Sequence, residues 1–555
     1  MNAETFFDAF DLLAEAPNSV AKLRELILQL AVQGKLVPQD PREEPASRLV
    51  AKLSQRSGHD PTTGESVGLR DVSLPRGWAW VRLNQLGEIC GGSTPSMQRA
   101  AYWGGNIPWI SPKDMKSHHV ASSELKLTKT ALNETTIRLI PKNSVLIVGR
   151  SGILKRTLPV CINTVECTVN QDLKVVIPYH DKIVEYVRLM LKGFEPFILT
   201  ELVKTGTTVQ SLKYDEFAEQ SFPIPPLAEQ RRIVSKVDEL LGLCDELETR
   251  QGARRELRER LVQAALDQLL ASQDPADFAT HWQRLQTHFD VLFDTPAAVE
   301  RLRQTIHQLA VLGKLVSVGK SVPEFTHISM EELVGQKNLR NGISLKPSAV
   351  LTGFKCLSLS AVRNGVIDCS DGKPVPLTPT QAEPYLVHEN EVFVVRGNGS
   401  KDFVGRAAIV RNLVDGIVFP DLLIRIPLDT KKVLADYFLI AWNSPSMRTE
   451  IERVARTTSG IWKINQGHIA GMVLPIPSIS TQKAIVSRVN SLSSMCEKLD
   501  IAIKEATLVS QILVSASVQN LLIDSSRSKS SNQKQVKQQS VANRSRTVVA
   551  SPYSK

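Results

Sequence analysis

Few side chains in this sequence have both the type and the spacing that catalysis or metal binding requires. Asp114 with Glu124-Leu125-Lys126 imitates the D…ExK pattern with which nucleases hold Mg²⁺. However, E-x-K is common by chance, and the second half of the chain has no equivalent. His118-His119 lacks a cysteine or acid at metal-ligand spacing and is interpreted as part of a surface loop. We therefore expect neither a metal nor another cofactor.

The glycine-rich stretches do not predict a nucleotide site. Gly91–Pro95 is a candidate phosphate-cradling nest, but such a run is more often a turn with glycines at fixed positions, and we favour the turn. GNGSKD at 397–402 differs from GxGxxG at its last position. The Asn-Pro-Pro-aromatic motif that an adenine methyltransferase needs is absent as well. The sequence thus predicts a chain that is not an enzyme by itself.

Composition indicates a protein of several domains. A chain of 555 residues is too long for one hydrophobic core. No run of about 18 apolar residues offers a membrane span, and the first residues carry acids where a signal peptide carries Lys or Arg. The seven cysteines include no C-x-x-C pair, which fits reduced thiols. We expect a cytoplasmic protein with no membrane partner.

The net charge of +10 gives only weak support for a nucleic-acid partner, because most of it lies in the tail. Residues 525–555 carry seven basic residues and no acid, so residues 1–524 have a net charge of +3. The tail is rich in Ser, Gln, Asn and Lys, a composition that predicts disorder.

The most informative feature is an internal repeat. SVAKLRELILQLAVQGKLV at 19–37 returns as AVERLRQTIHQLAVLGKLV at 298–316, with twelve identities at one constant offset. Each copy predicts a helix that ends at a glycine in the left-handed conformation, Gly34 or Gly313.

A second pair of segments, 222–248 and 474–500, shares eleven identical positions. Each carries Pro-Ile-Pro from its second residue onward, and this tripeptide ends an extended segment. Apolar residues then step by three or four from Ile233 to Leu247, and this spacing predicts one face of a helix. The pattern continues to about Leu270 and Leu522. Helices of ~40 residues would be ~60 Å long, and we expect the two to pack on each other.

Two stretches of about 150 residues, 72–222 and 320–474, separate these blocks and share a sparse skeleton. LIPKNSVLIVGRSG (139–152) parallels LVHENEVFVVRGNG (386–399), and VNQDLKVVIP (169–178) parallels VFPDLLIRIP (418–427). Short β-rich runs predict strands, with helices near 181–202 and 431–454. A shared strand pattern with different residues around it is typical of one fold that binds two different targets.

The two halves together predict a pseudo-twofold molecule. Duplex DNA also has twofold backbone symmetry, and dimeric readers contact half-sites ~34 Å apart. Different residues in the two variable stretches would make the DNA target bipartite and asymmetric. The paired helices would set the number of base pairs between its two half-sites.

This order of elements resembles the specificity subunit of type I restriction–modification enzymes. The resemblance covers residues 19–524 and rests on LPRGWAWVRLNQLGEICGGSTPS (74–96), YWGGNIPWISPKDM (102–115) and the two PIP…Q…IV…V…L helices. It implies that the variable stretches are target recognition domains for double-stranded DNA. It also implies that the repeated helices bind two modification (methyltransferase) subunits, which restriction subunits join. The second domain departs from the pattern, because it has no counterpart to Gly91–Pro95 or Trp103–Trp109 in its sequence.

We therefore predict an α+β fold with two mixed α/β target recognition domains, two long antiparallel helices and an internal pseudo-twofold repeat. The predicted domains are an N-terminal helical region (1–71), the first recognition domain (72–222), the central long helix with a linker helix (223–319), the second recognition domain (320–474), the distal long helix (475–524) and a disordered basic tail (525–555).

The candidate DNA contacts are basic and polar residues in loops beside the skeleton strands. Lys and Arg neutralise phosphates, whereas Arg and Asn also read base edges bidentately. The candidates are Lys113, Lys116, Arg150, Lys155 and Arg156 in the first domain and Arg396, Asn398, Ser400, Lys401, Arg406 and Lys463 in the second.

Two other classes of function stay open at this point. One is a coiled-coil scaffold whose variable domains bind protein partners, and the other is a standalone enzyme. Pulldown of co-expressed chains combined with a duplex-binding assay separates them.

Overall fold

The computed structural model describes residues 19–58, 74–206, 209–316, 323–345, 352–458 and 460–546, with side chains as far as residue 516. The chain forms two compact units. Unit 1 contains the residues up to 252 together with those from 507 onward, and unit 2 contains residues 253–506. The division falls inside both long helices, α10 (Leu227–Ala271) and α19 (Ile479–Arg546).

From residue 19 onward, unit 1 has two helices followed by strands and short helices up to α10. Its elements are α3 (Ser19–Val32), α4 (Ala46–Ser57), β1 (Ala79–Arg82), α5 (Leu83–Leu86), β2 (Gly87–Gly91), η1 (Ala100–Tyr102), β3 (Trp103–Ile110), β4 (His119–Val120), β5 (Lys126–Leu127), α6 (Lys129–Glu134), β6 (Val145–Val148), β7 (Arg150–Ser151), η2 (Gly152–Lys155), β8 (Val160–Asn163), β9 (Thr168–Val169), β10 (Leu173–Pro178), η3 (Asp181–Ile183), α7 (Val184–Gly193), α8 (Glu195–Glu201), β11 (Val203–Lys204), β12 (Gln210–Leu212), α9 (Tyr214–Glu219) and β13 (Ser221–Ile224).

Unit 2 follows the same plan between the end of α10 and the start of α19. Its elements are α11 (Pro275–Thr287), α12 (Phe289–Leu292), α13 (Pro296–Val311), β14 (Thr326–Ser329), α14 (Met330–Val334), η4 (Gln336–Asn338), β15 (Arg340–Asn341), β16 (Lys355–Leu357), η5 (Leu359–Ala361), β17 (Val362–Arg363), β18 (Val366–Asp368), β19 (Gly372–Pro374), α15 (Pro379–Ala382), η6 (Glu383–Tyr385), β20 (Val392–Val395), β21 (Gly397–Asn398), η7 (Lys401–Phe403), β22 (Ala407–Arg411), β23 (Ile417–Val418), β24 (Leu423–Ile426), α16 (Ala435–Trp442), α17 (Pro445–Val454), β25 (Arg456–Thr458), β26 (Ile461–Lys463), α18 (Gln466–Ala470) and β27 (Val473–Ile476).

The sheets of the two units correspond one to one within the described residues. Unit 1 has the strand orders β2-β10-β6-β8-β4, β5-β3-β9, β11-β12-β7 and β1-β13. Unit 2 has β15-β24-β20-β22-β18-β17, β19-β16-β23, β21-β26-β25 and β14-β27, so β17 is an addition at one edge. The parallel pairs also fall in equivalent places, β4–β8 with β18–β22 and β3–β9 with β16–β23.

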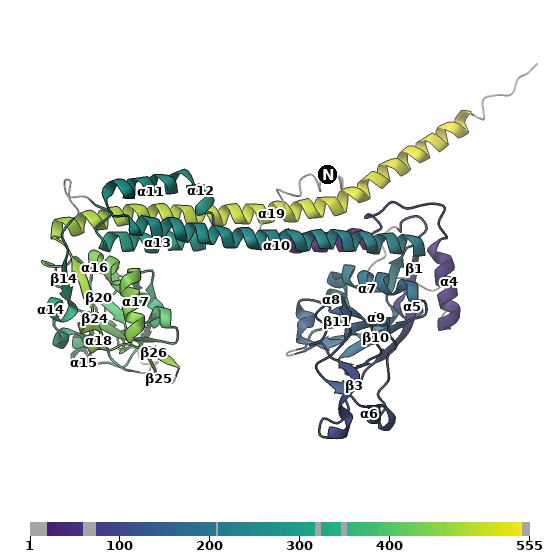
Figure 1. Ribbon diagram of the computed structural model, residues 1–555, viewed down its shortest axis with the longest axis horizontal. Helices are drawn as coiled ribbons and strands as arrows, with labels where there is room; N and C mark the ends of the chain where they lie inside the picture. The colour runs from purple at the N-terminus through teal and green to yellow at the C-terminus, as the bar shows by residue number, and fades with distance from the viewer. Residues whose placement is uncertain are drawn as a thin grey trace, which may run out of the picture. The chain divides into compact units, whose positions relative to one another are not determined.

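The central strand of each large sheet is apolar along its whole length. It lies between two neighbouring strands, and helices pack against the sheet. β6 reads VLIV and β20 reads VFVV, and every residue of both strands is buried. Asn143 and Asn390 precede these strands with φ of 62° and 67°, a left-handed conformation that asparagine tolerates. The aligned asparagines of the two halves therefore make the same turn. Figure 1 shows α16 and α17 beside the strands of unit 2.

The prediction that the second domain lacks a counterpart to Gly91–Pro95 and Trp103–Trp109 is wrong. β15 occupies the position of β2, and the next residue is Gly342, as Gly92 follows β2. A Cβ at Gly92 would lie 2.0 Å from the Val169 carbonyl oxygen, and one at Gly342 would lie 2.2 Å from that of Phe419. Only this close backbone approach requires glycine, so the surrounding letters differ freely. β16 likewise takes the place of β3.

Both repeated helices end as predicted. Gly34 and Gly313 have φ of 66° and 72°, and each lies at a Schellman turn. The Lys35 amide donates to the Leu30 carbonyl at 2.9 Å, and the Lys314 amide donates to that of Leu309 at the same distance.

The repeated Gln and Tyr residues join each sheet to its long helix. Gln230 Nε2 donates to the Pro225 carbonyl, and Gln482 Nε2 donates to that of Pro477, both at 2.9 Å. The Tyr186 and Tyr437 hydroxyls donate to the carbonyls of Pro223 and Pro475. The Gln and Tyr residues are identical in the two halves because they make the same hydrogen bonds in both units.

The long helices form the predicted packed pair inside unit 2. The end of α10 and the start of α19 run antiparallel (Figure 1) and share one hydrophobic cluster with α13, which includes Leu266, Val299 and Val489. Arg303 of α13 lies 3.0 Å from Asp500 of α19, as Arg24 of α3 lies 2.8 Å from Glu248 of α10 in unit 1. The predicted α+β class, with two mixed domains and two long helices, is confirmed.

α19 continues to Arg546, past residue 524, where the sequence places the start of a disordered tail. No glycine or proline lies between 525 and 546 to end the helix. The last part of the predicted tail, 547–555, lies outside the described residues.

Candidate nucleic-acid interface

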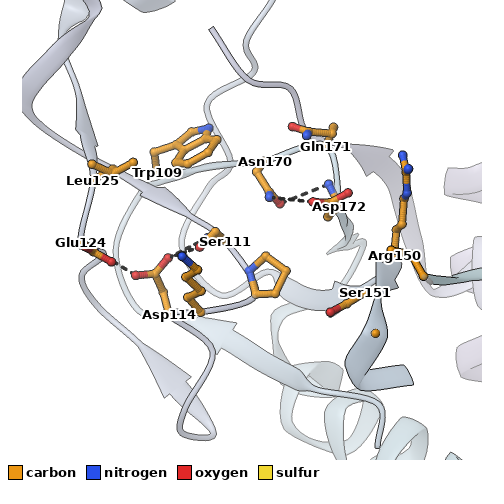
Figure 2. A pocket seen from close by; sticks show the side chains of 14 residues that line it. Trp109, Ser111, Asp114, Glu124, Leu125, Arg150, Ser151, Asn170, Gln171 and Asp172 are labelled. Carbon is orange, nitrogen blue, oxygen red and sulfur yellow. Dashed lines mark hydrogen bonds between the residues drawn. The ribbon is translucent and has the colours of Figure 1, made fainter. Parts of the chain in front are cut away.

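A cleft of about 680 Å³ in unit 1 is lined by two of the predicted DNA contacts, Lys113 and Arg150. Figure 2 shows Arg150 on the opposite side of this cleft from Asp114. Lys116 lines an adjoining hollow with Ser122, Ser123 and Lys113 itself. Lys155 and Arg156 lie at the end of η2, exposed but outside both hollows. The structure thus brings together three of the five candidates of the first domain.

The floor of the cleft is held by a carboxylate. Asp114 Oδ2 accepts from the Ser111 amide at 2.9 Å and from its hydroxyl at 2.7 Å, while Oδ1 accepts from the Glu124 amide at 2.9 Å (Figure 2). These bonds tie the loop after β3 to the segment before β5. Asp114 therefore shapes a loop. No group of three or more His, Cys, Asp or Glu that could bind a metal ion occurs in the described ranges.

The wall of the cleft contains Trp109, whose ring is oriented by the Gly91–Pro95 segment. Trp109 Nε1 donates to the Ser93 carbonyl at 3.1 Å, and its ring meets Trp103 edge-on at 5.3 Å between centroids. Residues 92–95 run as irregular backbone beyond β2, and Gly92 does not have a positive φ. Gly92 is needed because its backbone packs closely against Val169 of β9. The sequence favours a different role for this glycine, as part of a turn.

The opposite side of the cleft is a compact turn that positions Arg150. The Asp172 amide donates to Asn170 Oδ1 at 3.2 Å, and the Asp172 carbonyl accepts from the amides of Gly149 and Arg150 at 2.7 and 3.0 Å. This arrangement leaves the Arg150 side chain exposed beside the cleft (Figure 2). None of the five basic candidates of unit 1 forms an ion pair with a described residue, so their charges are available to an external anion.

The candidates of unit 2 gather around β21 and η7. Lys401 Nζ lies 4.9 Å from the centre of the Trp462 ring, and the Arg406 guanidinium lies 4.6 Å from that of Phe403. Both are cation–π contacts that hold a charge near the surface. Asn398 Oδ1 accepts from the Ser400 amide at 2.9 Å, which makes a local turn.

Arg396 and Lys463 lie at the two sides of this group. Arg396 is partly buried, with Nη1 3.3 Å from the Asp421 carbonyl and 3.9 Å from its carboxylate. It is therefore held by the fold. Lys463 is exposed on β26, opposite Gly397 of β21.

Sequence reasoning missed the hairpin that completes the small sheet in each unit. β11–β12 in unit 1 corresponds to β25–β26 in unit 2, and it adds Lys204 and Arg456 to the exposed basic residues. We call the sheets β11-β12-β7 and β21-β26-β25 the basic sheets. The signal was present, because KTGTTVQSLK (204–213) and RTTSGIWKIN (456–465) lie at the same offset as the two Pro-Ile-Pro blocks.

The remaining reactive side chains in the described segments show no arrangement for chemistry. His119 Nε2 lies 2.7 Å from a Glu185 carboxylate oxygen, and the pKa of the neighbouring His118 is lowered, mainly by burial and also by the charge of Arg188. The cysteines are free, and burial raises the pKa of the Cys161 and Cys167 thiols to about 12. Within the described ranges no helix combines the length and hydropathy that a bilayer crossing needs.

The fold and its surface define a protein class: one chain that presents two recognition domains of the same topology, each with a basic surface at equivalent strands. Residues 75–254 match the family described as the type I restriction modification DNA specificity domain. The chain is 25% identical to the type I restriction enzyme EcoEI specificity subunit of Escherichia coli, over 88% of this chain and 91% of that protein. It is 36% identical to the EcoR124I/EcoR124II specificity subunit of the same species, over 35% of this chain and 49% of the relative.

Among solved structures, the HsdS subunit from Thermoanaerobacter tengcongensis aligns with a TM-score of 0.40 and 14% identity, over 82% of this chain and 99% of that one. The matches in sequence extend along nearly the whole chain. The resemblance to type I specificity subunits, inferred from the motifs, is confirmed.

Proposed function

We propose that this chain is the DNA-specificity subunit of a type I restriction–modification complex and that it reads a bipartite, asymmetric duplex sequence. The observation that carries the proposal is the pair of basic sheets. They occupy the same place in two domains of one topology, yet Arg150 and Ser151 of β7 are replaced by Gly397 and Asn398 of β21. One scaffold with different side chains at the same place suits two different half-sites.

The proposed contacts to DNA are the exposed candidates around these sheets. In unit 1, Lys113 and Arg150 line the cleft beside Trp109, and Lys116 lines the adjoining hollow. In unit 2, Asn398 and Lys401 lie beside Trp462. Arginine and asparagine match the hydrogen-bonding edges of guanine and adenine, whereas lysine neutralises phosphate as a point charge. Specificity then depends on which of these groups each domain presents.

The proposed partners are two modification subunits, with restriction subunits joining them. Several large apolar side chains on the long helices are more than half exposed, and such side chains are unfavourable in water unless a partner covers them. They are Leu257 and Leu261 on α10, and Met495, Ile501, Leu508, Val509, Ile512 and Leu513 on α19. A second protein that buries these side chains would explain their exposure.

Chemistry is assigned to those partners. The described part of the chain holds no metal-ligand cluster, and Asp114 of the imitation nuclease triad is occupied by loop donors. We therefore expect the specificity chain to bind and position, and the modification subunits to transfer the methyl group.

The experiment compares the purified chain with the complex reconstituted from co-expressed modification subunits. The chain alone should not turn over S-adenosylmethionine, while the complex should methylate one bipartite sequence, mapped across a genome or a random library. Arg406→Gln, which lies outside the two basic sheets, should change or relax the second half-site only. Lys431→Gln is the matched control, because Lys431 is exposed beyond the end of β24 that lies away from β21. Methylation without sequence preference by the intact complex would refute the proposal.

A further inference from the structure

The basic sheets place cationic side chains in one cross-strand row in each unit. In unit 1 the register pairs Lys204 with Ser211 and Ser211 with Arg150. In unit 2 it pairs Arg456 with Lys463 and Lys463 with Gly397. Directly opposite residues point to the same face of a sheet, so each row lies on one face. We call these three-residue sets the cationic rows.

Each cationic row carries two positive charges, although different strands supply them. Unit 1 places them on the outer strands, at Lys204 and Arg150, whereas unit 2 places them on adjacent strands, at Arg456 and Lys463. All four side chains are exposed. The amount of charge is therefore the same in two domains whose other surface residues differ.

The rows hold this charge without internal compensation. Arg456 donates to the backbone carbonyls of Arg453 and Ala455 at 2.9 and 3.2 Å, which fixes its guanidinium but does not neutralise it. No carboxylate of a described residue forms an ion pair with any of the four. Like charges directly opposite in a sheet destabilise it, so Arg456 beside Lys463 is an arrangement that an external anion would stabilise.

On the face opposite the cationic rows, the residues of the two basic sheets differ in kind. Gln210 lies opposite Ser151 in unit 1 and is buried, whereas Trp462 lies opposite Asn398 in unit 2 and carries the Lys401 cation on its ring. These positions differ in size, polarity and exposure. Such different residues fit parts of the DNA that differ between the two half-sites. The cationic rows, which carry the same charge, fit a part of the DNA that both half-sites have.

We propose, on the basis of the proposed function, that the cationic rows are sequence-blind phosphate clamps, and that Lys204 and Arg456 bind the sugar–phosphate backbone and not base edges. The phosphodiester backbone is the part of duplex DNA that is the same in both half-sites, and it is the anion that two unpaired cations in a row fit. Arg150 and Lys463 complete the rows, so they contact phosphate as well. Discrimination between sequences then lies with the side chains outside the rows.

The test uses the full complex with modification subunits and the variants Lys204→Gln and Arg456→Gln. Binding is measured between 50 and 200 mM salt on the methylated target sequence and on an unrelated duplex of equal length. Loss of one phosphate contact should reduce the slope of log affinity against log salt by ~0.9, which is ~3- to 4-fold in affinity over that range. Both duplexes should weaken equally, and the mapped methylation sequence should stay unchanged. The conservative variants Lys204→Arg and Arg456→Lys should keep the parent slope.

Matched controls are Lys182→Gln in unit 1 and Lys431→Gln in unit 2, exposed lysines beyond the ends of β10 and β24 that lie away from the basic sheets. They should leave the slope unchanged. An unaltered slope in the row variants, or a weakened target with a relaxed methylation sequence, would overturn the assignment to phosphate. If the parent complex itself failed to distinguish the two duplexes, the proposed function would fail, and the salt slopes would still report on the rows.

Discussion

Replacing Gly92 or Gly342 by alanine tests the equivalence of the two domains. At Gly92 the added carbon would lie 2.0 Å from the Val169 carbonyl oxygen, about 1.4 Å closer than the 3.4 Å at which ordinary contact begins. Relieving the overlap displaces the segment whose Ser93 amide donates to Val169 and whose Ser93 carbonyl accepts from Trp109, both at 3.1 Å. Two hydrogen bonds at about 1 kcal/mol each, plus overpacking strain of about 1–2 kcal/mol, predict a loss of about 3–4 kcal/mol in the free energy of unfolding of unit 1.

The same substitution at Gly342 should destabilise unit 2 by a similar amount. The Ile343 amide donates to Phe419 at 3.0 Å and the Gly342 amide to Leu423 at 3.2 Å, and both bonds depend on the close approach. Hydrogen exchange read peptide by peptide reports each unit separately, which a single melting curve does not. Gly399→Ala, with nothing within 4 Å of the added carbon, should change stability by less than about 0.5 kcal/mol. If Gly342→Ala left unit 2 as stable as the parent while Gly92→Ala destabilised unit 1, the proposed equivalence would be wrong.

Three further predictions concern α10. Gly242 lies inside this helix with open space around it, so Gly242→Ala should raise the free energy of unfolding by about 1 kcal/mol in urea titration; a loss would mean that its environment is closed. Glu229 is buried beside Trp78 Nε1, and burial raises its pKa, so the unfolded chain ionises first and stability falls as pH rises through the ordinary glutamate pKa. Glu229→Gln should therefore be more stable than the parent at neutral pH, with a difference that shrinks in acid; a constant difference would contradict this. Four residues inserted after Leu247 should lengthen α10 by ~6 Å and the methylated spacer by one or two base pairs, and an unchanged spacer in an active complex would show that α10 does not set it.

The parts of the fold that were predictable are those where one residue type has one physical role. Gly34 and Gly313 end helices because glycine adopts φ near +70° without the strain that a Cβ atom adds. Gln230 and Gln482 bind a proline carbonyl from the first turn of a long helix, and a shorter amide would not reach it. Such positions keep their letters in both halves, so the repeat was visible.

The parts that were missed depend on the conformation of the backbone and can be formed by many different side chains. β11–β12 and β25–β26 need only extended conformation and register, so KTGTTVQSLK and RTTSGIWKIN share almost no letters. The counterpart of Gly92 was hidden for the same reason, since a single glycine is all that the close approach fixes. The predicted site residues therefore included Arg150 and Lys463 but not Lys204 of β11 or Arg456 of β25.

The division of the chain inside its long helices has a consequence for synthesis on the ribosome. Unit 2 is one continuous segment, 253–506, whereas unit 1 also includes residues from 507 onward. At ~5–20 residues per second, the N-terminal part of unit 1 must wait on the order of tens of seconds for its last segment, while unit 2 is completed in between. The unit made first is thus finished last, after the whole of unit 2 has left the ribosome.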